Sequence, residues 1–246
     1  MSVMPTSRST TATATASEVP ILRRNASRSL RLAAFFTMAV TGPYAILLLA
    51  AIILSAILTG NVFFPDLATS AGLEYAGRFP AAVTVGYLAD GLSHVLLFVS
   101  FMAIVAVLRP RWPTWSQLIL VGAIVQLLAG VTKAFVSIHT VISVGAAYLA
   151  ADAAGKVALL PLGGVVAGLR QGLQDMDTYG VMAVWVLIAL LPTETGMPRW
   201  VRWLGVGMAA AFLLHFGPIG FIIASLLLPV WAFLLGRWLK SEHAPQ

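Results

Sequence analysis

The chain has no cysteine among its 246 residues. This absence excludes a disulfide framework, a thiolate metal site and a catalytic cysteine. Charged residues are also scarce, at 10% of the chain, whereas soluble domains carry about 25%. Hydrophobic residues make up 59%, and the mean hydropathy is +0.92. The composition therefore predicts an integral membrane protein.

Acidic residues are few as well, with 9 Asp and Glu against 15 Lys and Arg and a formal net charge of +6. A basic excess can indicate a nucleic-acid partner. In this chain, however, the basic residues gather at the ends of apolar runs, as the topology of a membrane protein requires. We therefore expect the lipid bilayer, and not a nucleic acid, as the main partner.

Residues 1–30 lack aromatic side chains and are rich in Ser, Thr and Ala. Such a segment cannot bury enough apolar surface to fold, and it predicts a disordered basic tail. The apolar run that follows is longer than a signal-peptide core and begins too far from the N-terminus, so it predicts a retained first helix. A mitochondrial-type targeting signal is the alternative interpretation of the tail. A short second tail is expected at 241–246.

The region 31–240 predicts one all-α domain, an integral membrane bundle of six transmembrane helices. A helix needs about 20 mostly apolar residues to cross about 30 Å of hydrocarbon. Six segments meet or approach this length, with the fourth extended by the amphipathic residues before it: 32–58, 83–108, 116–143, 177–192, 200–216 and 218–239. The sequence His215-Phe216-Gly217-Pro218 predicts a tight hairpin between the last two.

The distribution of Lys and Arg predicts the orientation of this bundle. With six spans and both termini in the cytoplasm, eleven basic residues face the inside and three, Arg78, Lys156 and Arg170, face the outside. Lys133 lies within the membrane. This asymmetry follows the positive-inside rule and indicates a multi-pass protein of the cell membrane.

Two segments are expected outside the membrane, 59–82 and 144–176. The second contains an apolar run, 157–169, with Pro161 and two glycines. Thirteen residues suit an interfacial or re-entrant segment better than a span. We expect partial helix there, covering the outer mouth of the bundle.

Asp90 and Lys133 lie inside apolar stretches that otherwise predict spans. A charge at mid-bilayer costs at least about 2.5–3.5 kcal/mol, so such residues are few and usually paired. At 1.5 Å per residue, Asp90 lies about 10 Å and Lys133 about 13 Å from the outer surface. A short connection, RPRWPT, joins the two spans. The two charges are therefore predicted to meet.

Helical periodicity places other polar residues near this pair. Tyr87, Asp90 and His94 share one face of the second span, and Gln126 and Lys133 share one face of the third. The candidate pocket therefore consists of Asp90, His94, Lys133, Tyr87 and Gln126. Three interpretations remain open: a functional pocket with His94 as relay, a structural clasp that fixes helix register, and a Lys133 that extends to the outer headgroups.

Histidines raise the question of a metal or haem. His94, His139 and His215 all fall in the outer half of the predicted bundle. Their spacing matches no zinc-enzyme motif, and isolated interfacial histidines are the preferred interpretation, with no metal or cofactor. A haem-binding redox protein using His94 with His139 or His215 remains an alternative.

Two stretches resemble the DUF4386 family, whose members are bacterial six-span membrane proteins without an established activity. The first, YLADGLSHVLLFVSFMAIVAVLRPRWP, has an aspartate early in the second span. The second, YGVMAVWVLIALLPTETGMPRWVRWLG, has a Pro-Arg-Trp start to the fifth span. The resemblance covers about residues 35–240 and implies a six-span fold. It also implies an acidic residue in the third span, where this chain has Gln126 and Lys133.

Our first hypothesis is a non-enzymatic membrane protein that binds or moves a small apolar or amphipathic molecule, or a proton, through the outward-facing pocket. The alternative is an intramembrane enzyme. In that case Asp90 or His94 would be the general acid for a lipid or isoprenoid substrate held among Phe98, Phe101 and Tyr87.

Overall fold

The computed structural model describes Leu32, Phe35 and residues 67–213 and 218–241. This part of the chain is all-helical, as predicted, and contains no strand. Three of its helices are long and apolar enough to cross a membrane, namely Pro80–Leu108, Pro113–Ala150 and Ala153–Ala189. Apart from Leu32 and Phe35, the predicted first span, 32–58, lies outside the described residues, and so do the predicted hairpin residues His215 to Gly217.

The helices begin where local signals place them. Proline occupies the first turn of α3 (Pro80–Leu108) and of α4 (Pro113–Val136), where its missing N–H costs nothing. Asp152 caps α6 (Ala153–Ala189) by accepting a 2.7 Å hydrogen bond from the Gly155 amide. The other elements are α2 (Ser70–Arg78), the π-helix η1 (Ser137–Val141), α5 (Ile142–Ala150), the 3₁₀ turn η2 (Thr193–Thr195), α7 (Arg199–Leu213) and α8 (Pro218–Ser241).

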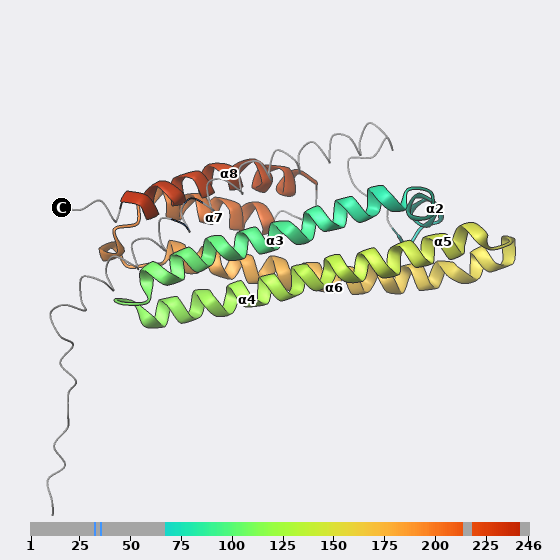
Figure 1. Cartoon of the computed structure of the whole chain (residues 1–246), viewed down its shortest axis with the longest axis horizontal. Helices are drawn as coiled ribbons and strands as arrows, with labels where there is room; N and C mark the ends of the chain where they lie inside the picture. The colour runs from blue at the N-terminus through green and yellow to red at the C-terminus, as the bar shows by residue number, and fades with distance from the viewer. Residues whose placement is uncertain (1–31, 33–34, 36–66, 214–217, 242–246) are drawn as a thin grey trace, which may run out of the picture.

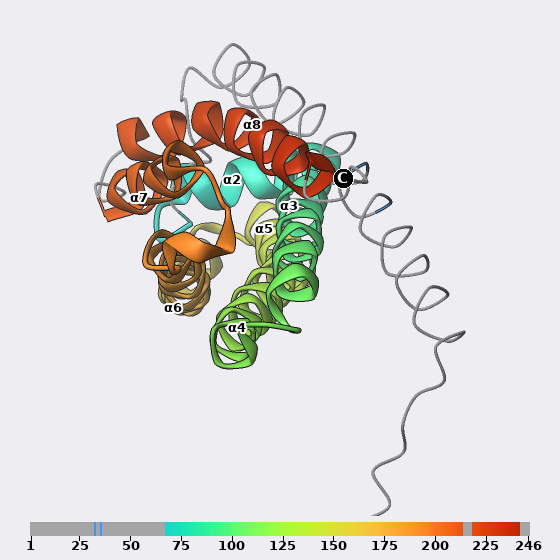
Figure 2. The same ribbon diagram turned by 90° about the vertical axis from the view of Figure 1, so that its left-hand side faces the viewer.

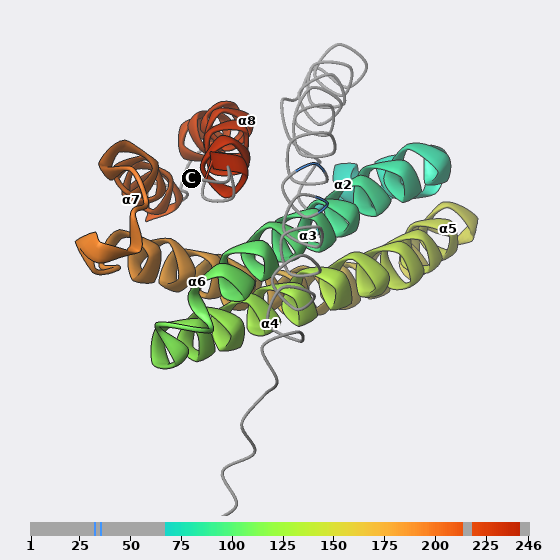
Figure 3. The same ribbon diagram turned by 60° about the vertical axis from the view of Figure 1, so that its left-hand side comes forward.

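The long helices form a ring in the order α3, α4, α6, α7 and α8, with α8 beside α3 (Figure 2). Figure 3 views α7 and α8 nearly end-on while α3 runs obliquely, so this pair crosses the others. The α3–α4 and α6–α7 turns lie at the same end of the bundle (Figure 1), which we call the arginine end. Opposite it, α2 packs against α5 at what we call the α2 end.

The segment 144–176, expected outside the membrane with partial helix, is helical on both sides of a break at Ala151 and Asp152. Helix α4 continues through η1 and α5 as one element of 38 residues, Pro113–Ala150. At 1.5 Å per residue it is about 57 Å long, well beyond the roughly 30 Å of a bilayer core. Only part of a helix of this length could lie within a bilayer core, so the predicted span 116–143 is part of a longer helix.

The run 157–169, expected to be an interfacial or re-entrant segment, forms part of the long helix α6. Only one side of this stretch packs on protein, because Val157, Val165 and Leu169 are exposed. Gly163 lies against the Leu67 carbonyl and Leu73, and Val166 is buried with them. Pro161 lies within the helix without ending it. The helix that contains most of the predicted fourth span, 177–192, therefore begins at Ala153.

Helix α4 has one outward face and one inward face. Val121, Leu128 and Phe135 are exposed at a spacing of seven residues, which suits contact with lipid. Gln126 and Lys133, also seven apart, are buried on the opposite face. The orientation of this helix therefore brings polar side chains inside and apolar ones outside.

Toward the arginine end the bundle has an apolar core. Phe101 and Trp185 each make an edge-on contact with Trp231, at ring-centroid distances of 6.1 and 6.3 Å. Surrounding them are buried aliphatic residues such as Ile104 and Val184. This core lies between the arginine end and the polar residues described next.

Candidate functional site

A column of polar side chains crosses the centre of α3, α4 and α6. Each helix contributes residues at helical spacing, so that they share one face. From the α2 end toward the arginine end, the column contains Tyr87, Asp90 and His94 on α3; Ser137, Lys133 and Gln126 on α4 and η1; and Arg170, Gln174 and Asp177 on α6. We call these nine residues the polar column.

The middle of the column is the ion pair predicted from the sequence. The Lys133 amine lies 2.9 Å from Asp90 Oδ2, which confirms that the two charges meet. The amine also donates a 2.6 Å hydrogen bond to Gln174 Oε1. The Lys133 side chain is only 4% exposed, so it does not extend to the headgroups, whereas Asp90 is 32% exposed. Asp90 is thus the more accessible member of the pair.

The His94 ring lies between two carboxylates. Its Nε2 is 3.5 Å from Asp90 Oδ1, and its Nδ1 is 3.1 Å from Asp177 Oδ1. Gln126 Nε2 is also 2.8 Å from Nδ1, so the amide and the Asp177 carboxylate compete for the same ring nitrogen. This competition makes the hydrogen bonding of the site depend on where the proton of the imidazole resides.

The contacts close into a circuit. Gln174 Nε2 donates to Asp177 Oδ2 at 3.4 Å and to Thr178 Oγ1 at 3.2 Å. Gln174 therefore connects Lys133 to Asp177, while His94 connects Asp177 back to Asp90. Buried polar groups are normally satisfied by partners. In this circuit most of them are, but His94 Nε2, Gln126 Oε1 and Asp177 Oδ1 are buried without a hydrogen bond among the described residues.

On the side of this circuit nearer the α2 end, Arg170 contacts the π-helix η1. Its Nε donates a 3.0 Å hydrogen bond to Ser137 Oγ, and its guanidinium lies 4.9 Å from the centre of the Tyr87 ring. A π-turn inside a long helix is rare and is often found at functional sites. Here the π-turn begins at Ser137, the residue that accepts the hydrogen bond from Arg170.

Gly130 explains how α3 and α4 come close enough to form the site. A Cβ atom at this position would overlap the His94 ring. Close approach of helices at small residues is a common feature of membrane bundles. The glycine thus makes room for the imidazole between the two helices.

All five residues predicted for the pocket belong to the column. Sequence reasoning missed the contribution of α6, namely Arg170, Gln174 and Asp177, because it assigned most of that stretch to a loop. A signal was present: positions 170, 174 and 177 follow helical spacing and share a face. Of the four charged groups, Arg170 and Lys133 balance Asp90 and Asp177 when His94 is neutral.

The two described histidines, His94 and His139, do not form a common site. His139 is exposed on η1, while His94 is buried, and His215 lies outside the described residues. Within 67–213 and 218–241, no group of three His, Asp or Glu side chains has an arrangement that could hold a metal ion.

Comparisons with known proteins find no matching family model, no similar curated protein and no similar solved structure. The resemblance to the DUF4386 family therefore stays a prediction.

Proposed function

We propose that this protein is a six-span membrane protein, with both termini in the cytoplasm, that takes up a proton from the outer side and binds it on His94. The observation that carries the proposal is the position of the His94 ring, with a carboxylate at each nitrogen and an amide competing at one of them. Histidine is the side chain that ordinarily changes charge between about pH 5 and 8.

Two hydrogen-bond arrangements follow from this geometry. In the neutral ring, Nε2–H faces Asp90 and Nδ1 accepts from Gln126, leaving Asp177 Oδ1 facing a lone pair. In the protonated ring, both nitrogens donate, and Nδ1–H turns from the amide to Asp177. Charge-assisted bonds of this kind are about twice as strong as neutral ones. Proton uptake thereby exchanges a partner on α4 for a partner on α6.

The accessible side of the column supports uptake from outside. Asp90 is partly exposed, whereas Asp177 is buried, and Asp90 contacts both His94 and Lys133. Between His94 and the arginine end the described core is mostly apolar, with Leu97, Phe101 and Val181 buried. The arginine end would face the cytoplasm under the positive-inside rule. A second buried apolar cluster, which includes Leu73, Val83 and Val141, lies at the α2 end, so the partly exposed Asp90 is the proposed entry point for the proton. Passage of the proton further inward requires the helices to rearrange.

The same geometry disfavours haem ligation by His94. Both ring nitrogens already face carboxylate oxygens, so neither lone pair points toward open space. An acid–base enzyme would use the same residues, but it would also need a substrate site beside them. The proton-binding interpretation needs only the contacts that the described residues make.

Infrared spectroscopy of the protein in liposomes tests the proposal. Across the range in which imidazole and carboxyl groups titrate, the wild type should show a histidine transition accompanied by changes in carboxylate bands. His94→Gln should lose this transition. His139→Gln, the matched change at an exposed histidine, should keep it. Retention of the coupled transition in His94→Gln would refute the proposal.

A second measurement asks whether the proton moves. Liposomes that contain a pH-sensitive dye are subjected to a pH gradient. The wild type should dissipate the gradient faster than His94→Gln, and His139→Gln should match the wild type. If all three match protein-free liposomes while the infrared transition is present, the column binds a proton without transporting it.

A further inference from the structure

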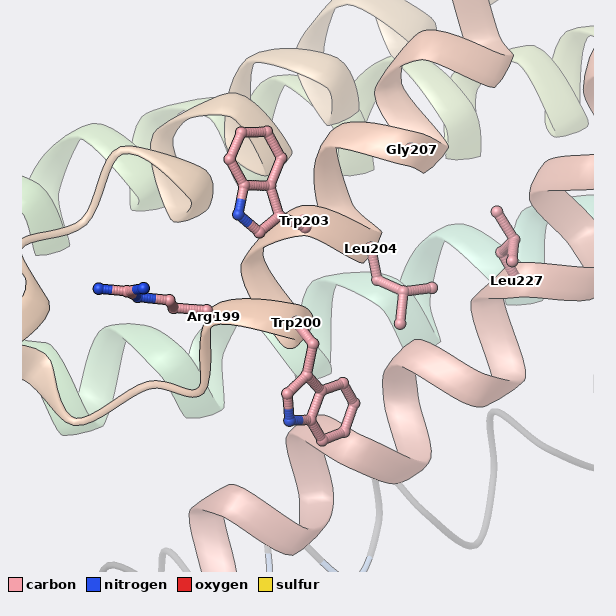
Figure 4. Close-up of a pocket in the computed structure, with 6 residues that line it drawn as sticks. All are labelled: Arg199, Trp200, Trp203, Leu204, Gly207 and Leu227. Atoms are coloured by element: carbon pink, nitrogen blue, oxygen red, sulfur yellow. The ribbon is translucent and has the colours of Figure 1, made fainter.

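A second feature of the molecule lies away from the polar column, between α7 and α8. It is an open groove of about 580 Å³. This volume falls within the roughly 300–1,000 Å³ of ordinary small-molecule sites. Figure 4 shows the lining residues: Arg199, Trp200, Trp203, Leu204, Gly207 and Leu227.

The lining is almost wholly apolar except at one end. Leu204 of α7 and Leu227 of α8 face each other across the groove (Figure 4). Gly207 leaves part of it unfilled, since a Cβ atom there would have nothing within 4 Å. The guanidinium of Arg199 extends away from this lining at the first turn of α7. The groove thus has apolar walls and a cationic side chain, Arg199, at one end.

Its position in the molecule matches a membrane interface. Arg199 begins α7 at the arginine end, where Arg109 and Arg111 also lie. Trp200 and Trp203 are 47% and 70% exposed. Tryptophan is enriched at the level of lipid headgroups, and arginine beside it attracts their phosphates.

We propose that this groove binds one anionic phospholipid, with an acyl chain along Leu204, Gly207 and Leu227 and the phosphate at Arg199. Charge complementarity selects the occupant, because a second protein helix would not need a cation at the rim. The positive end of the α7 dipole, which lies at Arg199, favours the same negative headgroup. The site is separate from the polar column and does not depend on proton binding.

Native mass spectrometry of the full chain in detergent, with phosphatidylglycerol or phosphatidylcholine added, tests this site. The wild type should bind one phosphatidylglycerol in preference to phosphatidylcholine. Gly207→Leu should reduce the binding of both lipids at least tenfold, because the new side chain fills the groove. Leucine also favours helix more than glycine does, so α7 should remain intact.

Arg199→Gln tests the headgroup contact. It should weaken phosphatidylglycerol binding about fivefold and leave phosphatidylcholine unchanged, as expected for a basic residue worth about 1 kcal/mol near anionic lipid. Two matched variants should behave as wild type. Arg111→Gln removes an exposed arginine from the same end, and Gly164→Leu fills equally open space on α6.

Three results would overturn the assignment. Equal binding of the two lipids by the wild type would mean that ordinary bilayer lipid covers the groove. Unchanged binding by Gly207→Leu would place the lipid elsewhere. A loss of dimers in Gly207→Leu, with lipid binding unchanged, would make a second copy of the chain the occupant.

Discussion

Two buried cations in this bundle are held in different ways. Lys133, in the polar column, contacts side chains only: the Asp90 carboxylate at 2.9 Å and the Gln174 amide oxygen at 2.6 Å. Arg202, at the arginine end, donates to backbone carbonyls only. Its Nη1 donates to the Leu191 oxygen at 2.5 Å, and its Nε and Nη2 both donate to the Met197 oxygen at 3.2 Å.

The difference indicates which region can change state. Carbonyl groups are fixed by the backbone, so the partners of Arg202 move only if the α6–α7 turn moves. Carboxylates and amides can turn about their side-chain bonds and can gain or lose protons. The column is therefore suited to switching, whereas the contacts of Arg202 are suited to locking a turn at the end of α6.

Lys133→Met should have the largest effect on stability. Removing one partner of a buried pair leaves the other charge uncompensated, and we expect a loss of about 3–5 kcal/mol in the free energy of unfolding. Equilibrium unfolding in mixed SDS micelles measures the loss. The double variant Asp90→Asn with Lys133→Met should unfold at a higher denaturant concentration than Lys133→Met alone. Additive losses would show that the two charges do not depend on each other.

Arg202→Met removes the corresponding cation at the arginine end. We expect a loss of about 2–3 kcal/mol, because the carbonyls of Leu191 and Met197 lose charged donors. The matched variant Arg237→Met, on an exposed position of α8, should change stability little. The infrared transition of His94 should be unaffected by either change. A shift in that transition in Arg202→Met would mean that the two regions are coupled.

Gly130→Val tests how tightly the column is packed. The added side chain overlaps the His94 ring, so we expect a loss of about 1–3 kcal/mol and a disturbed histidine transition. Gly168→Val on α6 meets open space and serves as the control. Equal stability of the two variants would show that α3 and α4 separate easily at this level.

Ser137→Ala should have the smallest effect. It removes the acceptor of the Arg170 hydrogen bond, and such contacts between membrane helices average about 0.6 kcal/mol. The same unfolding measurement in mixed micelles should therefore show a small shift. A loss as large as that of Lys133→Met would make the Arg170 contact a principal support of the column.

The sequence was most informative where a polar residue interrupted an apolar run. Asp90, Lys133 and His94 could be placed on facing helices because periodicity fixes their faces and the short turn after Leu108 fixes the pairing of those helices. Helix ends were harder to predict. After Val136 the sequence has no signal that would end the helix before Ala151. The part of this helix that packs on α2 is also as apolar as the part that could face lipid, so composition does not separate the two.

The amino-acid sequence alone determined that the described chain is helical, that its long helices can cross a membrane, and that Asp90 and Lys133 lie at one level. These features depend on local composition and spacing. The tertiary structure decided that α6 supplies Gln174 and Asp177, which complete the circuit around His94. It also decided that α7 and α8 enclose a groove. These arrangements join residues more than 20 positions apart, and only the packing of whole helices determines which of their faces meet.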